Sequence, residues 1–175
     1  MSESVDPGLA FSWRVLKYWR LLAVAAAVIA LDQWSKNWIV HHIAFGTYGE
    51  EYGAIPVIRG FFYIVHVGNT GAAWSIFSGQ SLILAALAAA TLVVIFVWRK
   101  ALGIVGAYPQ FCFGLLCGGI VGNLVDRVMR GHVVDFLDFH FGRYAYPTFN
   151  VADSAICVGV GLYILSTFRA PHRQK

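Results

Sequence analysis

The stretches HVVDF at residues 132–136 and NVAD at residues 150–153 decide how this chain is organised. Each contains one acid, Asp135 or Asp153, and each adjoins a long apolar run. An ionisable group kept at a bilayer is expensive and is therefore a functional candidate. Two carboxylates that meet in space cannot both ionise cheaply, so they hold one proton between them. The two stretches therefore predict a pair of acids with the chemistry of an aspartic protease.

The composition indicates a membrane protein of one domain. The chain has 175 residues, of which 58% are hydrophobic and 13% are charged. A soluble domain is about half apolar and a quarter charged, so a soluble fold would lack the polar surface it needs. The net charge of +4 does not indicate nucleic-acid binding, because the basic residues lie in short clusters beside apolar runs.

Four apolar runs are long enough to cross a hydrocarbon core of about 30 Å. They cover residues 18–40, 81–98, 103–129 and 150–168. Basic residues precede the first run, as in a signal peptide, but the run continues to Val40 without a cleavage site, so it reads as an uncleaved helix. The predicted fold class is an all-α membrane protein with four transmembrane helices.

The segments at residues 41–79 and 131–149 differ from these runs and are predicted to lie outside the bilayer. The first contains several glycines and short β-prone runs at residues 54–58 and 61–67, which predict a small sheet. Residues 71–77 carry enough apolar side chains for a short helix in the membrane interface.

The distribution of basic residues predicts that both termini are cytoplasmic. Residues 1–17 then form an N-terminal tail, residues 18–168 the membrane domain and residues 169–175 a basic tail. The basic residues placed on the inner side are Arg14, Lys17, Arg20, Arg99, Lys100, Arg169, Arg173 and Lys175. The polar residues that are candidates for function, among them Asp135 and Asp153, then lie together at the outer face.

Several polar and small residues have simple structural interpretations. Asp32 and Lys36 are spaced i,i+4 with the acid first, which favours an ion pair on one helix face. Gly118, Gly119 and Gly122 would let another helix approach closely. The three cysteines, Cys112, Cys117 and Cys157, fall in apolar runs and are interpreted as buried hydrophobic residues.

Other interpretations of the acids remain open at this point. Asn150 followed by Asp153 is also typical of a helix N-cap, and Asp138 competes with Asp135 as the second acid. Asp126 and Arg127 favour a structural ion-pair network. His132, Asp135, Asp138 and His140 could be taken as a metal cluster, but alternating faces in a β-prone segment and the lack of a helical i,i+4 pair oppose it.

Five ordered motifs resemble the bacterial lipoprotein signal peptidases, or signal peptidase II. They are DQxSK at 32–36, NTGAA at 69–73, GGxxGNLxDR at 118–127, GHVVDF at 131–136 and FNxADS at 149–154. Together they span nearly the whole membrane domain. Trp74 stands where the family usually has Phe, and neither the first 15 or so residues nor the segment after residue 168 matches anything diagnostic.

The resemblance implies an intramembrane aspartyl endopeptidase with a small extracytoplasmic β-cradle and no cofactor or metal. Such enzymes remove the signal peptide of diacylglyceryl-modified prolipoproteins by cutting before the lipidated Cys. The resemblance makes Asp135 and Asp153 the catalytic pair. It assigns substrate or inhibitor binding, or support of the pair, to Asn69, Gly71, Asn123, Arg127 and Asn150, and structural ion pairs to Asp32, Lys36 and Asp126.

The resemblance also implies partners and a location. Expected partners are lipid-modified prolipoproteins, membrane lipids and the cyclic peptide inhibitor globomycin, with no nucleic acid and a monomeric state. The expected location is the bacterial cytoplasmic (inner) membrane, with the active site near the outer face. The alternatives are an ion or proton transporter, whose acids should lie at mid-bilayer depth, and a structural scaffold with capped helix ends.

Overall fold

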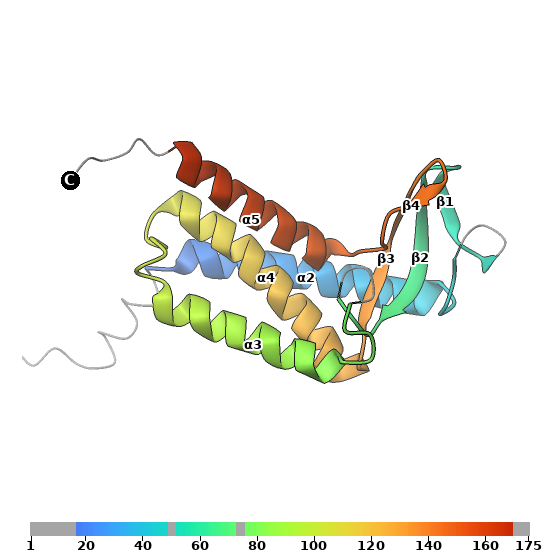
Figure 1. Cartoon of the computed structure of the whole chain (residues 1–175), viewed down its shortest axis with the longest axis horizontal. Coiled ribbons are helices and arrows are strands. Elements are labelled where there is room, and N and C mark those ends of the chain that lie inside the picture. Colours follow the sequence, from blue (N-terminus) through green and yellow to red (C-terminus); the bar gives the residue numbers. More distant parts are fainter. Residues whose placement is uncertain (1–16, 49–51, 73–75, 170–175) are drawn as a thin grey trace, which may run out of the picture.

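The structure is a computed structural model that describes residues 17–48, 52–72 and 76–169. Within these ranges, long helices run side by side and a small sheet lies across one end of the bundle (Figure 1). The helices are α2 (Trp19–His42), α3 (Ser81–Trp98), α4 (Ala107–Arg130) and α5 (Val151–Arg169). The prediction of helical runs joined by two β-containing segments is confirmed.

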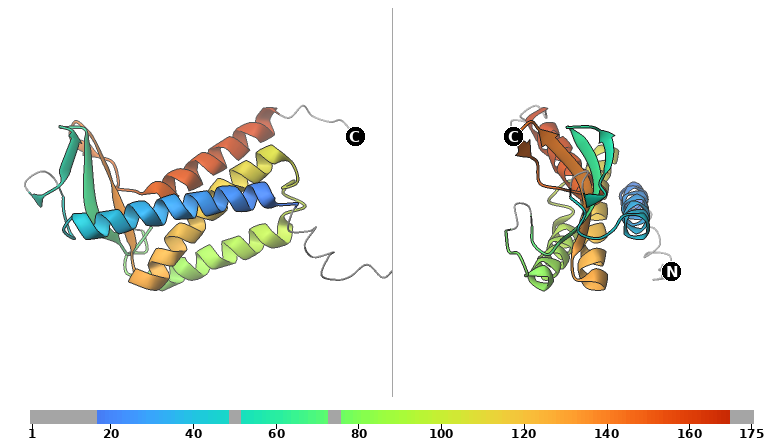
Figure 2. Two further views of the ribbon diagram at one scale, coloured as in Figure 1. Left: turned by 180° about the vertical axis from the view of Figure 1, so that it is seen from behind. Right: turned by 90° about the vertical axis from the view of Figure 1, so that its right-hand side faces the viewer.

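Helix α4 packs against each of the other three helices, and its glycines make this possible. A Cβ added at Gly118 would lie 2.9 Å from the carbonyl oxygen of Ala25 in α2. A Cβ at Gly119 would collide with the carbonyl oxygen of Ala152 in α5. The glycines predicted to allow close helix packing therefore do so on two faces of α4, and Figure 2 shows α2 and α5 beside it.

Among the described residues, α3, α4 and α5 are the helices that are long and apolar enough to cross a membrane. Helix α2 is also long, with 24 residues, but it does not meet this criterion. The difference from the four predicted spans arises from the polar residues in its second half, which include Asp32 and Lys36. Composition thus supports three membrane spans.

The four-stranded sheet is antiparallel, with strands in chain order β1 (Ile55–Ile58), β2 (Phe62–Asn69), β3 (Val133–Phe141) and β4 (Tyr144–Ala145). The two predicted strands in residues 41–79 are thus confirmed, and β3 and β4 come from the second predicted loop. In the β2–β3 pair, Asn69 lies opposite Val133 and Val67 lies opposite Asp135. This register brings the end of β2 beside the acid of β3.

Two local predictions have different outcomes. Gly131 ends α4 with φ of 75°, the left-handed conformation expected of a C-terminal glycine cap. The short helix predicted over residues 71–77 falls partly on residues 73–75, which include Trp74 and lie outside the described ranges. The described residues on either side form bends and turns, because their backbone is closed locally by Ala72 N–H donating to Ile76 O.

Candidate active site

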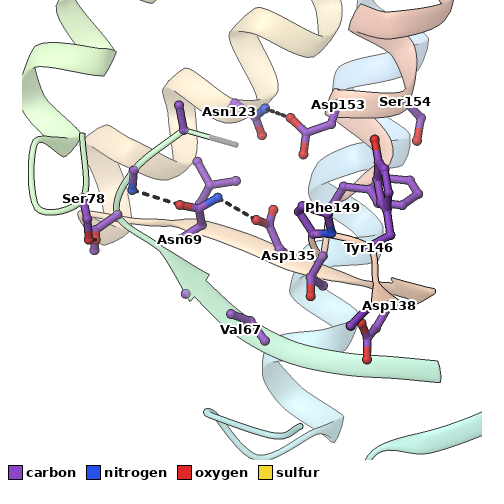
Figure 3. Close-up of a pocket in the computed structure, with 18 of the residues that line it drawn as sticks. Val67, Asn69, Ser78, Asn123, Asp135, Asp138, Tyr146, Phe149, Asp153 and Ser154 are labelled. Atoms are coloured by element: carbon purple, nitrogen blue, oxygen red, sulfur yellow. Dashed lines mark hydrogen bonds between the residues drawn. The ribbon is translucent and has the colours of Figure 1, made fainter. Parts of the chain in front are cut away.

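Asp135 and Asp153 line the same cavity, which lies where the sheet meets the helix ends and has a volume of about 850 Å³ (Figure 3). Asp135 is the third residue of β3, and Asp153 lies in the first turn of α5. The segment between them is short, and Phe149 bridges back to Leu137 of β3. The chain therefore returns to the same place after 18 residues, the difference between 153 and 135.

Asp153 is held by a reciprocal capping arrangement at the start of α5. The Asp153 N–H donates to Oδ1 of Asn150 at 3.0 Å, and the Asn150 N–H donates to Oδ2 of Asp153 at 3.2 Å. These two contacts satisfy backbone donors that a helix start leaves unpaired. The N-cap interpretation of Asp153 is therefore correct, and the cap also fixes the direction in which its carboxylate points into the cavity.

Asn150 also links the two acids. Its Nδ2 donates to Oδ1 of Asp135 at 2.7 Å and to Oδ1 of Asn123 at 3.2 Å. Asn123 in turn donates from Nδ2 to Oδ1 of Asp153 at 2.7 Å. The buried side-chain amides of Asn150 and Asn123 thus connect the carboxylate of Asp135 on β3 with that of Asp153 on α5.

The end of β2 completes the surroundings of Asp135. Nδ2 of Asn69 donates to Oδ2 of Asp135 at 3.0 Å, while Oδ1 of Asn69 accepts the Gly71 N–H at 2.9 Å (Figure 3). The Gly71 carbonyl accepts a hydrogen bond from Arg127 Nη2 at 3.0 Å. The predicted residues Asn69, Gly71, Asn123, Arg127 and Asn150 therefore come together around the two acids.

The environment of Asp135 favours its neutral form. Burial is the largest cause and the charge of Asp153 adds to it, and together they raise the pKa of Asp135 to about 7. Hydrogen bonds from Asn69 and Asn150 oppose this shift without cancelling it. A carboxyl group of this kind is still partly protonated at neutral pH and can donate its proton, which is the property of a general acid.

A buried ion network lies directly behind the pair. Lys36 Nζ contacts Asp32 Oδ2 at 2.8 Å, Asp126 Oδ2 at 2.9 Å and Asn123 Oδ1 at 2.9 Å. The side chains of Asp32, Lys36 and Asp126 are all 0% exposed. The expected ion pairs of these three residues are confirmed, including the i,i+4 pair on α2.

The network differs from the prediction in the partner of Asp126. That carboxylate pairs with Arg130 one turn further along α4, whereas Arg127 turns toward Gly71 and the Asn123 carbonyl. The reason is geometric, since residues at i and i+4 share a helix face and residues at i and i+1 do not. Asp32 has a further task that sequence did not suggest, because its Oδ1 accepts the Ala152 N–H at the start of α5.

Asp138 lies in the same cavity but has another partner. Its Oδ2 contacts His140 Nε2 at 2.7 Å, and both residues line the cavity wall. Among the described residues, no group of three or more His, Cys, Asp or Glu side chains is arranged to hold a metal ion. The cysteine prediction was wrong in part. Cys112 is buried, but Cys117 is half-buried, and Cys157 is exposed and lines the cavity.

Sequence reasoning missed other cavity residues, among them Tyr48 and Tyr146. No motif marks either tyrosine. Tyr48 follows Thr47, which bridges to His66 of β2, and Tyr146 donates its N–H to the Phe139 carbonyl oxygen of β3, so both reach the cavity only when the sheet forms. The arrangement as a whole combines a neutral-prone carboxyl, a second carboxylate held at a helix N-terminus, and amide donors that fix both. These are the parts needed to activate a water molecule and protonate a peptide carbonyl.

Comparisons with known proteins find similarity over most of the chain. A family model described as signal peptidase (SPase) II matches residues 24–169. The chain is 40% identical to a lipoprotein signal peptidase of Oleidesulfovibrio alaskensis over 159 residues, covering 87% of this chain and 97% of the relative. It is 37% identical to a lipoprotein signal peptidase of Geobacillus kaustophilus, with 86% and 92% covered.

A solved structure described as a bacterial membrane enzyme is also similar, with a TM-score of 0.75 and 29% sequence identity. The match covers 89% of this chain and 91% of that one. The likeness therefore extends over the helices and the sheet that carry the cavity.

Proposed function

The chain belongs to the signal peptidase II family, an integral membrane family of lipoprotein signal peptidases, and from this we propose an aspartyl mechanism carried by Asp135 and Asp153. The protein removes the signal peptide from diacylglyceryl-modified prolipoproteins by cutting the peptide bond before the lipidated Cys. The observation that carries the proposal is the shared cavity, in which Asn150 holds both carboxyl groups.

The two acids divide the work in this mechanism. Asp153 takes a proton from a water molecule whose oxygen bonds to the scissile carbonyl carbon, while Asp135 gives its proton to the carbonyl oxygen. The resulting diol returns a proton to Asp135, Asp153 passes its proton to the nitrogen, and the C–N bond breaks to leave an acid and an amine. The positive end of α5 favours the ionised form of Asp153, and burial favours protonated Asp135.

Helix α2 serves as a fourth transmembrane span in this proposal. Its 24 residues extend about 36 Å, which exceeds the hydrocarbon thickness of about 30 Å. The charges that lower its hydropathy are turned inward, since Asp32 and Lys36 are fully buried and paired. Its outward side chains include Leu31, Trp34 and Trp38, which suit lipid and the membrane interface.

The remaining arrangement follows from the basic residues. Residues 1–17 and 169–175 are cytoplasmic tails, residues 18–168 form the peptidase domain, and the cavity opens at the outer face of the bacterial cytoplasmic membrane. A substrate already anchored by acyl chains then meets the acids without leaving the bilayer. Globomycin would compete for the same cavity, and the enzyme works as a monomer in this proposal.

The test is cleavage of a synthetic diacylglyceryl lipobox peptide by purified protein in lipid. We expect a product that begins with the lipidated Cys and is identified by mass spectrometry, and a loss of turnover of at least 1,000-fold (about 4 kcal/mol) in Asp135→Asn and in Asp153→Asn. A chelator should leave the rate unchanged.

The matched control is His41→Gln, at an exposed position whose ring hydrogen-bonds within its own helix to the Asn37 carbonyl oxygen. This variant should retain wild-type turnover. Cleavage that survives either Asp→Asn substitution, or that depends on a metal, would remove the basis of the mechanism. Proton flux through reconstituted vesicles without any cleavage would instead favour the transporter alternative.

A further inference from the structure

The cavity has two ends of different chemistry. Toward the helices it is lined by apolar groups of α5 such as Ile156, and toward the sheet by Tyr48, Asp138 and His140. In Figure 3, Asp138 lies beyond Asp135 when followed from Asp153. The proposed mechanism uses only the acids nearer the helices, so the polar end on the sheet is left without a role.

A β-bulge places Asp138 in the cavity. Residues three apart in a regular strand face opposite sides, so Asp135 and Asp138 should not share one space. The N–H groups of Phe136 and Leu137 both donate to the Phe149 carbonyl oxygen, at 3.1 Å and 2.9 Å. Two residues thus oppose one, which shifts the alternation by one position and turns Asp138 to the face of Asp135.

Asp138 is buried and its side chain is held in one orientation, as is typical of a group that binds a ligand. It is only 5% exposed, and one carboxylate oxygen is fixed by His140 at 2.7 Å. Burial raises the pKa of Tyr48, and the negative charges of Asp138 and Asp135 raise it further. The phenol therefore lies close enough to both acids to interact with their charges. Bulges near active sites commonly re-aim a side chain in this way.

The geometry points to a specificity subsite, formed by Asp138 and His140, for the polypeptide that follows the cleaved bond. This inference rests on the proposed function. The signal helix and acyl chains are apolar and belong at the helix end, so the hydrated part of the substrate must leave over the sheet. Asp138 lies three residues along β3 from Asp135, about 10 Å, which an extended peptide covers in about three residues.

The subsite therefore receives the two residues after the lipidated Cys. A buried carboxylate accepts hydrogen bonds and favours a positive charge, so a substrate with Lys at these positions should be preferred over one with Glu. The hydrogen bond from His140 already occupies one oxygen of this carboxylate, and it therefore weakens the preference for Lys over Glu.

The experiment compares kcat/KM for three diacylglyceryl lipopeptides that carry Lys, Ala or Glu at the two residues after the Cys. In Asp138→Asn we expect the ratio of the Lys peptide to the Glu peptide to fall about fivefold. In His140→Gln the ratio should rise, because the carboxylate loses its neighbour. The control His41→Gln should keep the wild-type ratio.

The ratio is expected to fall in Asp138→Asn and to rise in His140→Gln. A purely structural role of these residues would instead lower the rates on all three peptides together. If Asp138→Asn does not fold, the rise in His140→Gln alone supports the subsite. Equal ratios in the wild type and in both variants overturn it. Absence of cleavage of every peptide by the wild-type protein would instead overturn the proposed function, so the two failures are distinguishable.

Discussion

At the residue scale, the two acids of the cavity differ because their elements differ. Asp135 lies in a strand with no helix terminus to stabilise its charge, is 2% exposed and receives only amide donors. Asp153 receives a backbone N–H at the start of a helix in addition to the amide of Asn123. The two carboxyl groups therefore differ in the donors that hold them, which suits the proposed division into acid and base.

This difference predicts the pH dependence of the reaction. If protonated Asp135 is the acid, kcat/KM falls about tenfold per pH unit once the pH exceeds its pKa of about 7. The sign follows from the raised pKa, since the proton is present below this value and lost above it. The measurement is the cleavage rate of the lipopeptide from pH 5 to 9, in a buffer of constant ionic strength.

A variant of Asn69 tests whether the fall in kcat/KM above pH 7 comes from Asp135. Asn69→Ala removes a hydrogen bond that stabilises the ionised form of Asp135, so the descending limb should move to higher pH. A rate that stays level between pH 7 and pH 9 in the wild type would show that Asp135 is not the proton donor.

At the element scale, three helices meet at one buried lysine. Lys36 of α2 contacts Asp126 and Asn123 of α4, and its partner Asp32 accepts a hydrogen bond from the first turn of α5. Asp32, Lys36, Asp126 and Arg130 together carry no net charge, which makes their burial affordable. The network fixes the start of α5 and so the position of Asp153.

We expect Lys36→Met to lower the free energy of unfolding by about 3–5 kcal/mol, because it leaves Asp32 and Asp126 buried without their central cation. The measurement is the melting temperature in detergent. The double variant Lys36→Met with Asp32→Asn should recover part of the loss, and Lys100→Met, at an exposed position, should match the wild type. A melting temperature of Lys36→Met within a degree of the wild type would contradict this role.

The elements also show how far sequence reasoning reaches. The bounds of α3 match the prediction at both ends, because an uninterrupted apolar run leaves no alternative, and Gly131 marks the end of α4 by its backbone preference. The Asp32–Lys36 pair follows from spacing along one helix. Each of these features depends on residues close together in the chain.

Features that depend on distant residues could not be predicted. The contact of Asp32 with Ala152 joins residues 120 positions apart, and the bulge at Phe136 exists only because Phe149 returns to the strand. The exposure of Cys157 depends on which face of α5 meets α4. In the same way, the motifs named the residues around Asp135, whereas Tyr48 required the folded cavity.

At the scale of the whole molecule, the sheet and the helices have separate tasks. The bundle carries apolar surface to the lipid and holds one acid, and the sheet carries the other acid at the end of the bundle (Figure 1). The site forms only where they meet, so its depth in the membrane is set by the orientation of the bundle. The proposed orientation, with the cavity at the outer face and the N-terminus in the cytoplasm, requires α2 to cross the bilayer.

The last prediction tests this crossing with single cysteines in a background in which Cys112, Cys117 and Cys157 are replaced by Ala. If α2 spans the membrane with the site outside, His41→Cys at its outer end should react with a membrane-impermeant thiol reagent in spheroplasts. Lys17→Cys, at an exposed position just before the start of α2, should react only once the membrane is opened, because that end of α2 then lies on the cytoplasmic side. Equal labelling of both positions in sealed spheroplasts would place them on one side. Helix α2 could then not be a span, and the buried charges of Asp32 and Lys36 would need another explanation.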